Sequence, residues 1–172
     1  MREMFRYSFT LALICIISAF LLALVNTFTK PKILAQMQSA EEESLKEVMP
    51  EAQNFIPVKS EDSIIYYKAE DKDGKLLGAA FKASGKGYSS TIDTMVGMLK
   101  DGTITSIKVL SQNETPGLGS QVSEPGFTGR FKDKLDLSDI QAITGATISS
   151  RAVINSVKEK AAQIRALIKD GK

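Results

Sequence analysis

The sequence predicts an α+β protein with a single N-terminal transmembrane helix followed by a mainly antiparallel sheet flanked by helices. Three features predict this class: a long run without charged residues near the N-terminus, several short strand-like segments separated by Asp-Gly pairs, and an apolar stripe at helical spacing near the C-terminus. The chain has 172 residues, of which 43% are hydrophobic and 24% charged. These values are typical of one globular domain with an added N-terminal segment.

The composition excludes several kinds of chemistry. The chain has no His and no Trp, and its one cysteine, Cys15, lies inside the apolar run. Haem with an imidazole ligand, Cys-ligated iron–sulfur clusters, tetrahedral zinc, Ser-His-Asp or Cys-His catalysis and an internal disulfide are therefore excluded. The net charge of +2 is too small to predict a nucleic-acid partner. Any chemistry must come from a bound organic cofactor, or from carboxylates and hydroxyls.

The apolar run from Phe9 to Phe28 predicts the transmembrane helix, because about 20 residues match the hydrocarbon thickness of a bilayer. A cleaved signal peptide is the alternative, but the run is long for one and no small-x-small cleavage site follows it closely. Ile14 stands before Cys15, where lipoprotein processing requires a small residue. Two basic residues flank each end of the run, so the positive-inside rule barely decides its orientation.

Residues 29–54 are expected to form a helical juxtamembrane linker. Between Pro31 and Pro50 the apolar residues recur at mixed helical spacings, and the two prolines mark the ends. The acidic run Glu41–Glu43 within this segment is expected to be a solvated face.

The folded domain is predicted to comprise residues 55–172 and to contain an antiparallel meander over residues 63–110. Asp73-Gly74 and Asp101-Gly102 are strong signals for tight hairpin turns. A flexible loop, Gly85–Ser90, interrupts the strands. The predicted strands are residues 63–68, 76–83, 91–99 and 103–110.

Three further elements are predicted after the meander. Phe127 and Phe131 stand at helical spacing within residues 121–134 and are expected to be core residues. A short strand is expected over residues 135–140. The last helix should start near Arg151 and run to about Lys169, with one apolar stripe packed against the sheet.

Thr144–Ser150 is the segment most suited to binding a ligand. Its small residues allow close approach to the backbone, and the free N–H groups at a helix start favour a bound anion such as phosphate. An ordinary N-cap is the alternative, and the residues alone favour it. Glu114–Gly119 can likewise form a rigid, sharply folded loop, although the residues alone favour a simple connector between sheet and helix.

Together, these two segments resemble a known family. Thr-Gly-Ala-Thr followed by Ile-Ser-Ser is similar to the flavinylation motif of the FMN-binding domains in the Rnf and Na⁺-pumping NADH:quinone oxidoreductase complexes. Glu-Thr-Pro-Gly-Leu-Gly resembles the second signature of that family, in the same order and at a similar separation. Tyr88 matches a Gly-Tyr element near the cofactor.

The resemblance implies that FMN is attached through a phosphoester bond to Thr147. The residues themselves predict no catalytic residue and no metal site in this chain. The other residues that the resemblance places near the cofactor are Thr144, Gly145, Ala146, Ser149, Ser150, Glu114, Thr115, Leu118, Gly119 and Tyr88.

The family also implies a function, a location and partners. The expected function is that of a non-autonomous electron-carrier subunit in a membrane complex that couples ferredoxin oxidation to NAD⁺ reduction and ion translocation. Its N-terminus, residues 1–8, would be cytoplasmic and its FMN-binding domain extracytoplasmic, with the single helix in the cell inner membrane. The other subunits of the complex are the expected partners. A separate Mg²⁺-dependent flavin transferase with FAD as donor would attach the FMN, because the chain has no evident base to activate a Thr hydroxyl.

Three other interpretations are open. The chain could be the C subunit of a Na⁺-pumping NADH:quinone reductase, although that subunit usually carries extra sequence. It could be a stand-alone membrane-anchored flavin reductase domain, or a non-catalytic anchored binding module. The sequence also departs from the family at two positions: Gln141 replaces an Asp six residues before the modified Thr, and Gln112 replaces a His two residues before the Glu-Thr-Pro signature.

Overall fold

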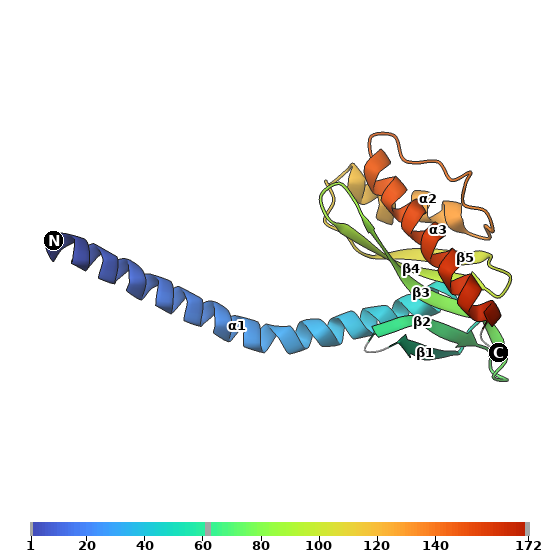
Figure 1. The fold of residues 1–172 in the computed structure, drawn as a ribbon, viewed down its shortest axis with the longest axis horizontal. Coiled ribbons are helices and arrows are strands. Elements are labelled where there is room, and N and C mark those ends of the chain that lie inside the picture. Colours follow the sequence, from blue (N-terminus) through green and yellow to red (C-terminus); the bar gives the residue numbers. More distant parts are fainter. Residues whose placement is uncertain (1, 61–62, 171–172) are drawn as a thin grey trace. The chain divides into compact units, whose positions relative to one another are not determined.

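The computed structural model describes residues 2–60 and 63–170, and its elements follow one another as a long helix, five strands, short helical turns and a final helix (Figure 1). The chain divides into two units, Met1–Ala40 and Glu41–Lys172. The predicted α+β class is confirmed.

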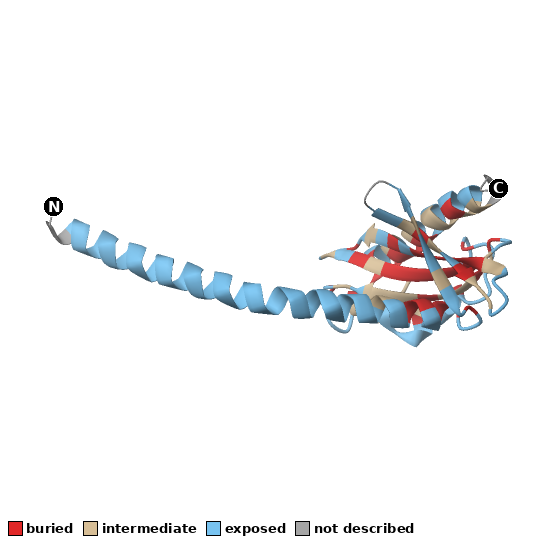
Figure 2. Ribbon diagram, turned by 90° about the horizontal axis from the view of Figure 1, so that it is seen from below, coloured by how far each residue is buried: buried red, intermediate tan, exposed pale blue. Residues whose placement is uncertain are grey.

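Helix α1 (Arg2–Val48) is continuous over 47 residues, with Pro31 inside it. The predicted span at residues 9–28 and most of the predicted linker are therefore parts of one helix. A proline in a helix removes one backbone hydrogen bond, and here it does not end the helix. The helix is long and apolar enough to cross a membrane, and its large apolar side chains between Met4 and Met37 are exposed (Figure 2).

The last turns of α1 belong to the core of the second unit. Leu45 and Val48 are buried there, and Met49 and Ala52 continue the same cluster just after the helix. Their partners in the sheet are Ala69, Ala80 and Met95. The expectation of a fully solvated acidic face is wrong at Glu41, whose carboxylate accepts a 2.8 Å hydrogen bond from the Tyr67 hydroxyl. Burial, together with this bond to Glu41, raises the pKa of Tyr67 to about 12.

The five strands form one sheet in the order β1-β2-β3-β4-β5, and each neighbouring pair is antiparallel. The predicted meander is confirmed, and Gly74 and Gly102 have the positive φ values that its turns require, 74° and 98°. The first strand was not among the predicted ones because most of its side chains are exposed and it has no clear alternation. The strands are β1 (Asn54–Ser60), β2 (Ser63–Glu70), β3 (Leu76–Lys86), β4 (Thr91–Leu99) and β5 (Ile104–Ser111).

Helix α3 (Thr147–Asp170) packs on the sheet face opposite to the one that the end of α1 covers. Val153, Val157 and Ile164 on α3 are buried against Phe81 and Val96 on β3 and β4. The helix starts at Thr147, four residues earlier than predicted.

Residues 119–131 form three short helical segments, η1 (Gly119–Ser123), α2 (Pro125–Thr128) and η2 (Gly129–Phe131). Phe127 and Phe131 are core residues, as predicted, and their ring centroids lie 5.5 Å apart. The strand predicted over residues 135–140 is wrong. The Asp136 carboxylate accepts the Ser138 N–H at 2.9 Å, and such a local turn competes with strand pairing.

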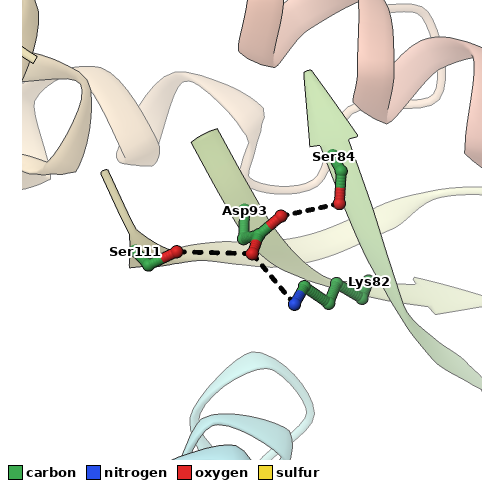
Figure 3. A network of polar contacts seen from close by, with 4 residues as sticks. All are labelled: Lys82, Ser84, Asp93 and Ser111. Atoms are coloured by element: carbon green, nitrogen blue, oxygen red, sulfur yellow. Dashed lines mark hydrogen bonds and ion pairs between the residues drawn. The ribbon is translucent and has the colours of Figure 1, made fainter. Parts of the chain in front are cut away.

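A polar cluster joins β3, β4 and β5 on the face that the end of α1 partly covers (Figure 3). Asp93 accepts hydrogen bonds from Ser84 at 2.7 Å and Ser111 at 3.3 Å, and it pairs with Lys82 at 2.9 Å. Burial opposes ionisation of this carboxyl, but the contacts with Ser84, Lys82 and Ser111 prevail and lower its pKa.

Gly97 allows the end of α1 to approach β4, and this closeness can be tested. A Cβ at this position would lie 2.4 Å from the Val48 carbonyl oxygen, which itself accepts a 2.6 Å bond from the Thr105 hydroxyl. We expect Gly97→Ala to lower the free energy of unfolding by about 1–3 kcal/mol, because backbone must move to relieve the overlap. Amide hydrogen exchange of the sheet in the detergent-solubilised chain measures this. Gly126→Ala is the control, since its added Cβ meets no atom within 4 Å, and equal losses in both variants would contradict the prediction.

Candidate functional site

A cavity of about 440 Å³ lies where three segments that are distant in the sequence meet, and its size is typical of small-molecule sites. The segments are the loop between β3 and β4, the loop after β5 and the start of α3. The lining residues are Tyr88, Glu114, Thr115, Leu118, Gly119, Gly145, Ala146, Thr147, Ile148 and Ser149. Nine of the eleven residues predicted from the sequence are therefore brought together at one cavity.

The start of α3 presents unused hydrogen-bond donors to this cavity. Thr147 is the first residue of the helix and is exposed. Within the described part of the chain, the backbone N–H groups of Thr147, Ile148 and Ser149 have no hydrogen-bond acceptor, and neither has the Thr147 hydroxyl. Gly145 precedes them with a φ of 83°, so the left-handed turn into the helix requires a glycine here. Free N–H groups at the positive end of a helix can hold an anion against the wall of the cavity.

Glu114 joins the three segments. Its carboxylate accepts backbone N–H groups from Tyr88 at 3.1 Å, Ser89 at 3.0 Å and Ser90 at 2.9 Å. It also accepts the Ser149 hydroxyl of α3 at 2.6 Å and the Ser90 hydroxyl at 3.3 Å. The side chain is only 6% exposed, so one buried carboxylate fixes both the β3–β4 loop and the helix start.

These hydrogen bonds control the protonation of Glu114. Burial alone would raise its pKa, but the bonds from Ser149 and from the backbone of Ser90, Ser89 and Tyr88 outweigh burial and hold the pKa below the ordinary value of 4.5. Glu114 is therefore an anion at neutral pH.

The glycines of the site make room for this carboxylate. A Cβ on Gly87 would lie 2.6 Å from Glu114 Oε1, and one on Gly119 would lie 2.8 Å from both Glu114 Cβ and the Ser149 hydroxyl. The predicted rigid loop after β5 is present, closed by hydrogen bonds from Leu118 N–H and Ser120 N–H to the Thr115 carbonyl.

Two of the predicted residues do not line the cavity. Thr144 is exposed outside it, and Ser150 is buried, with its hydroxyl accepting Ile143 N–H at 3.0 Å and donating to the Ala146 carbonyl at 2.8 Å. The Ser149 hydroxyl does lie at the cavity, but its hydrogen is already donated to Glu114. The serine hydroxyls of the motif thus have partners in the protein.

The apolar part of the cavity is open to solvent. Tyr88 is 73% exposed, Ile148 56% and Leu118 50%, so three large side chains surround the opening. Sequence reasoning did not select Ile148. A signal was available, because Ile148 lies inside the Thr144–Ser150 segment but off the apolar stripe that α3 buries in the core.

The site has little chemistry of its own. Among the residues that the structure describes, no group of three or more His, Cys, Asp or Glu side chains could hold a metal ion. Glu114 and Tyr88 are the titratable side chains of the lining, and Glu114 is held by its five donors. This arrangement can bind and orient a cofactor, but it lacks a base that would activate the Thr147 hydroxyl.

The two positions that differ from the family pattern do not line the cavity. Gln112 supports the Glu114 loop, because its side-chain oxygen accepts the Glu114 N–H at 2.7 Å. Gln141 is exposed and lines a separate hollow together with Arg151 and Lys158.

The lowered pKa of Glu114 predicts a pH-dependent contribution to stability. The contribution is fully present above the unfolded-state pKa near 4.5 and is lost as the pH falls through the lower folded-state value. We expect Glu114→Gln to lose about 1–3 kcal/mol of unfolding free energy at neutral pH, because one oxygen that accepts hydrogen bonds becomes a donor. The difference from the parent protein should shrink in acid. A difference that stays constant from pH 7 to below pH 4 would contradict this prediction.

The comparisons with known proteins agree with the predicted resemblance. Residues 87–162 match the model of the FMN-binding domain, and residues 1–48 match that of the RnfG N-terminal region. The chain is 32% identical to the G subunit of the ion-translocating oxidoreductase complex of Methanosarcina acetivorans, over 91% of this chain and 92% of that protein.

Two further relatives have similar coverage. The G subunit of the proton-translocating ferredoxin:NAD(+) oxidoreductase complex of Clostridium ljungdahlii is 31% identical, over 94% of this chain and 92% of that protein. The G subunit of the Na(+)-translocating ferredoxin:NAD(+) oxidoreductase complex of Acetobacterium woodii is 31% identical, over 91% and 89%. This chain therefore belongs to the family of Rnf complex G subunits and contains its FMN-binding domain.

Proposed function

We propose that this protein is the electron-carrier subunit of a membrane-bound, ion-translocating ferredoxin:NAD⁺ oxidoreductase complex, with FMN joined to Thr147 by a phosphoester bond. The observation that supports this most directly is the exposed Thr147 hydroxyl at the cavity, inside the segment that matches the FMN-binding domain. Next to it are three backbone N–H groups that have no acceptor among the residues that the structure describes. The names of the relatives support the assignment to such a complex.

The residues present fit a flavin mononucleotide. A phosphate attached at Thr147 would lie at the positive end of α3, where the N–H groups of Ile148 and Ser149 would be its donors. The Ser149 and Ser150 hydroxyls are not proposed as phosphate donors, since both already donate within the protein, to Glu114 and to the Ala146 carbonyl. Tyr88, Leu118 and Ile148 would offer apolar surface to the ring.

When bound, the flavin supplies the redox chemistry. The protein holds it by the phosphate end and leaves the opening of the cavity accessible, as the exposure of Tyr88 indicates. Such a site suits transfer of electrons between neighbouring subunits rather than turnover of a soluble substrate. The chain is a non-autonomous part of an oxidoreductase.

Attachment of FMN is proposed to depend on a separate flavin transferase. The new bond joins the Thr147 oxygen to the FMN phosphorus, the pyrophosphate bond of the FAD donor breaks, AMP leaves, and the hydroxyl proton needs an acceptor. The cavity offers only Glu114, which is already fully engaged, and this supports an acceptor on a second protein.

The first experiment tests the attachment site. We expect Thr147→Ala to abolish flavin fluorescence in a denaturing gel and the added FMN mass on the Thr147 peptide, after maturation with the transferase. Loss of stability should be small, because Thr147 is exposed and its hydroxyl has no hydrogen-bond partner among the described residues. Thr144→Ala is the matched control and should keep the full flavin content, since this hydroxyl lies outside the cavity. A fluorescent band that persists in Thr147→Ala would refute the assignment.

The second experiment tests the proposed orientation, with a cytoplasmic N-terminus and an extracytoplasmic domain. Lys72 is exposed in the turn between β2 and β3. In a Cys15→Ser background, Lys72→Cys should react in intact cells with a thiol reagent that does not cross the membrane. Labelling only after the membrane is opened would place the domain in the cytoplasm.

A further inference from the structure

The charge of Glu114 has no counter-ion. No lysine or arginine of the described residues forms an ion pair with this carboxylate, and all of its contacts are with neutral N–H and O–H groups. Dipoles of this kind stabilise a charge but do not cancel it. A buried cavity wall therefore has a net negative charge, which a salt bridge would have removed.

The contacts of Glu114 require a carboxylate at this position. Three backbone N–H groups, from residues 88–90, cannot act as acceptors, and the carboxylate oxygens accept all three. A glutamine at this position would keep only one acceptor oxygen. If its amide nitrogen took the place of Oε2, it would face the Tyr88 N–H and the Ser149 hydroxyl, which both donate to Oε2 in Glu114. The observed conformation of the loops around the cavity thus requires a negatively charged side chain at position 114.

We propose that Glu114 sets the redox potential of the flavin, keeping it low by placing an uncompensated negative charge in the wall of the cavity. This inference rests on the proposed function. An electron that passes from a reduced neighbouring carrier to the bound cofactor oxidises that carrier by one electron and adds one negative charge to the cavity. The fixed negative charge of Glu114 repels the negative charge that reduction adds, and this repulsion is stronger in a partly buried site than in water.

A low potential of the flavin affects electron transfer to it and from it in opposite ways. A lower potential makes the reduced cofactor a stronger donor to the next carrier and a weaker acceptor from the previous one. Glu114 acts here as a positioning residue that also supplies a field, because its carboxylate oxygens are already bonded to the protein.

The test compares midpoint potentials of the full chain, matured with its transferase and solubilised in detergent, by spectroelectrochemical titration. Glu114→Gln removes the charge and should shift the potential to a more positive value. Ser149→Ala removes the shortest hydrogen bond to Glu114 but keeps the charge, so its potential should not rise. A purely structural role for Glu114 would disturb both variants in the same direction, and that result would overturn the proposal.

A third variant adds a negative charge near the cavity, whereas Glu114→Gln removes one, so it should shift the potential in the opposite direction. Gln112→Glu is nearly isosteric and can still accept the Glu114 N–H, so it adds a negative charge without disturbing the contacts of the Glu114 carboxylate. We expect a more negative potential than in the parent protein, and this result decides the question if Glu114→Gln loads no flavin. An unchanged or more positive potential in Gln112→Glu would overturn the proposal. Parent protein without any flavin would refute the proposed function instead.

Discussion

The site depends on one buried carboxylate. Glu114 lies in the loop after β5, yet its partners belong to the β3–β4 loop and to the start of α3. Loops without such a shared partner would be held only by their own short-range turns. Because Glu114 is 6% exposed and its carboxylate accepts five hydrogen bonds, it holds three separate segments together around one cavity.

The rest of the domain supports this arrangement from both sides of the sheet. Helix α3 is fixed by the apolar contacts of Val153, Val157 and Ile164, so its first turn has a defined position relative to β3 and β4. On the other face the last turns of α1 pack over Met95, at the close approach that Gly97 permits. Both packing layers therefore fix the walls of the cavity, while Tyr88 at its opening is exposed.

The sequence predicted the sheet and most of the site because these depend on local signals. Asp-Gly pairs fixed the turns at Gly74 and Gly102, and two motifs located residues that the fold brings together. It could not predict that Ser149 donates to Glu114, a contact across 35 positions that involves no periodic pattern. The strand expected over residues 135–140 failed because an Asp136 turn outweighed an apolar alternation.

The contacts of Ser149 explain how the start of α3 can bind the Glu114 carboxylate and still have donors for a second anion. Its hydroxyl is donated to Glu114 on one side, while its backbone N–H has no acceptor within the described residues. The carboxylate is therefore satisfied by a side chain and by the β3–β4 loop, and the backbone donors of Thr147, Ile148 and Ser149 are left for a second anion. Repulsion from Glu114 would disfavour an anion near Gly119, whereas the helix dipole would favour one near Thr147, the proposed attachment site. In the proposed binding mode, a phosphate near Thr147 would leave the apolar opening beside Tyr88 and Leu118 for the flavin ring.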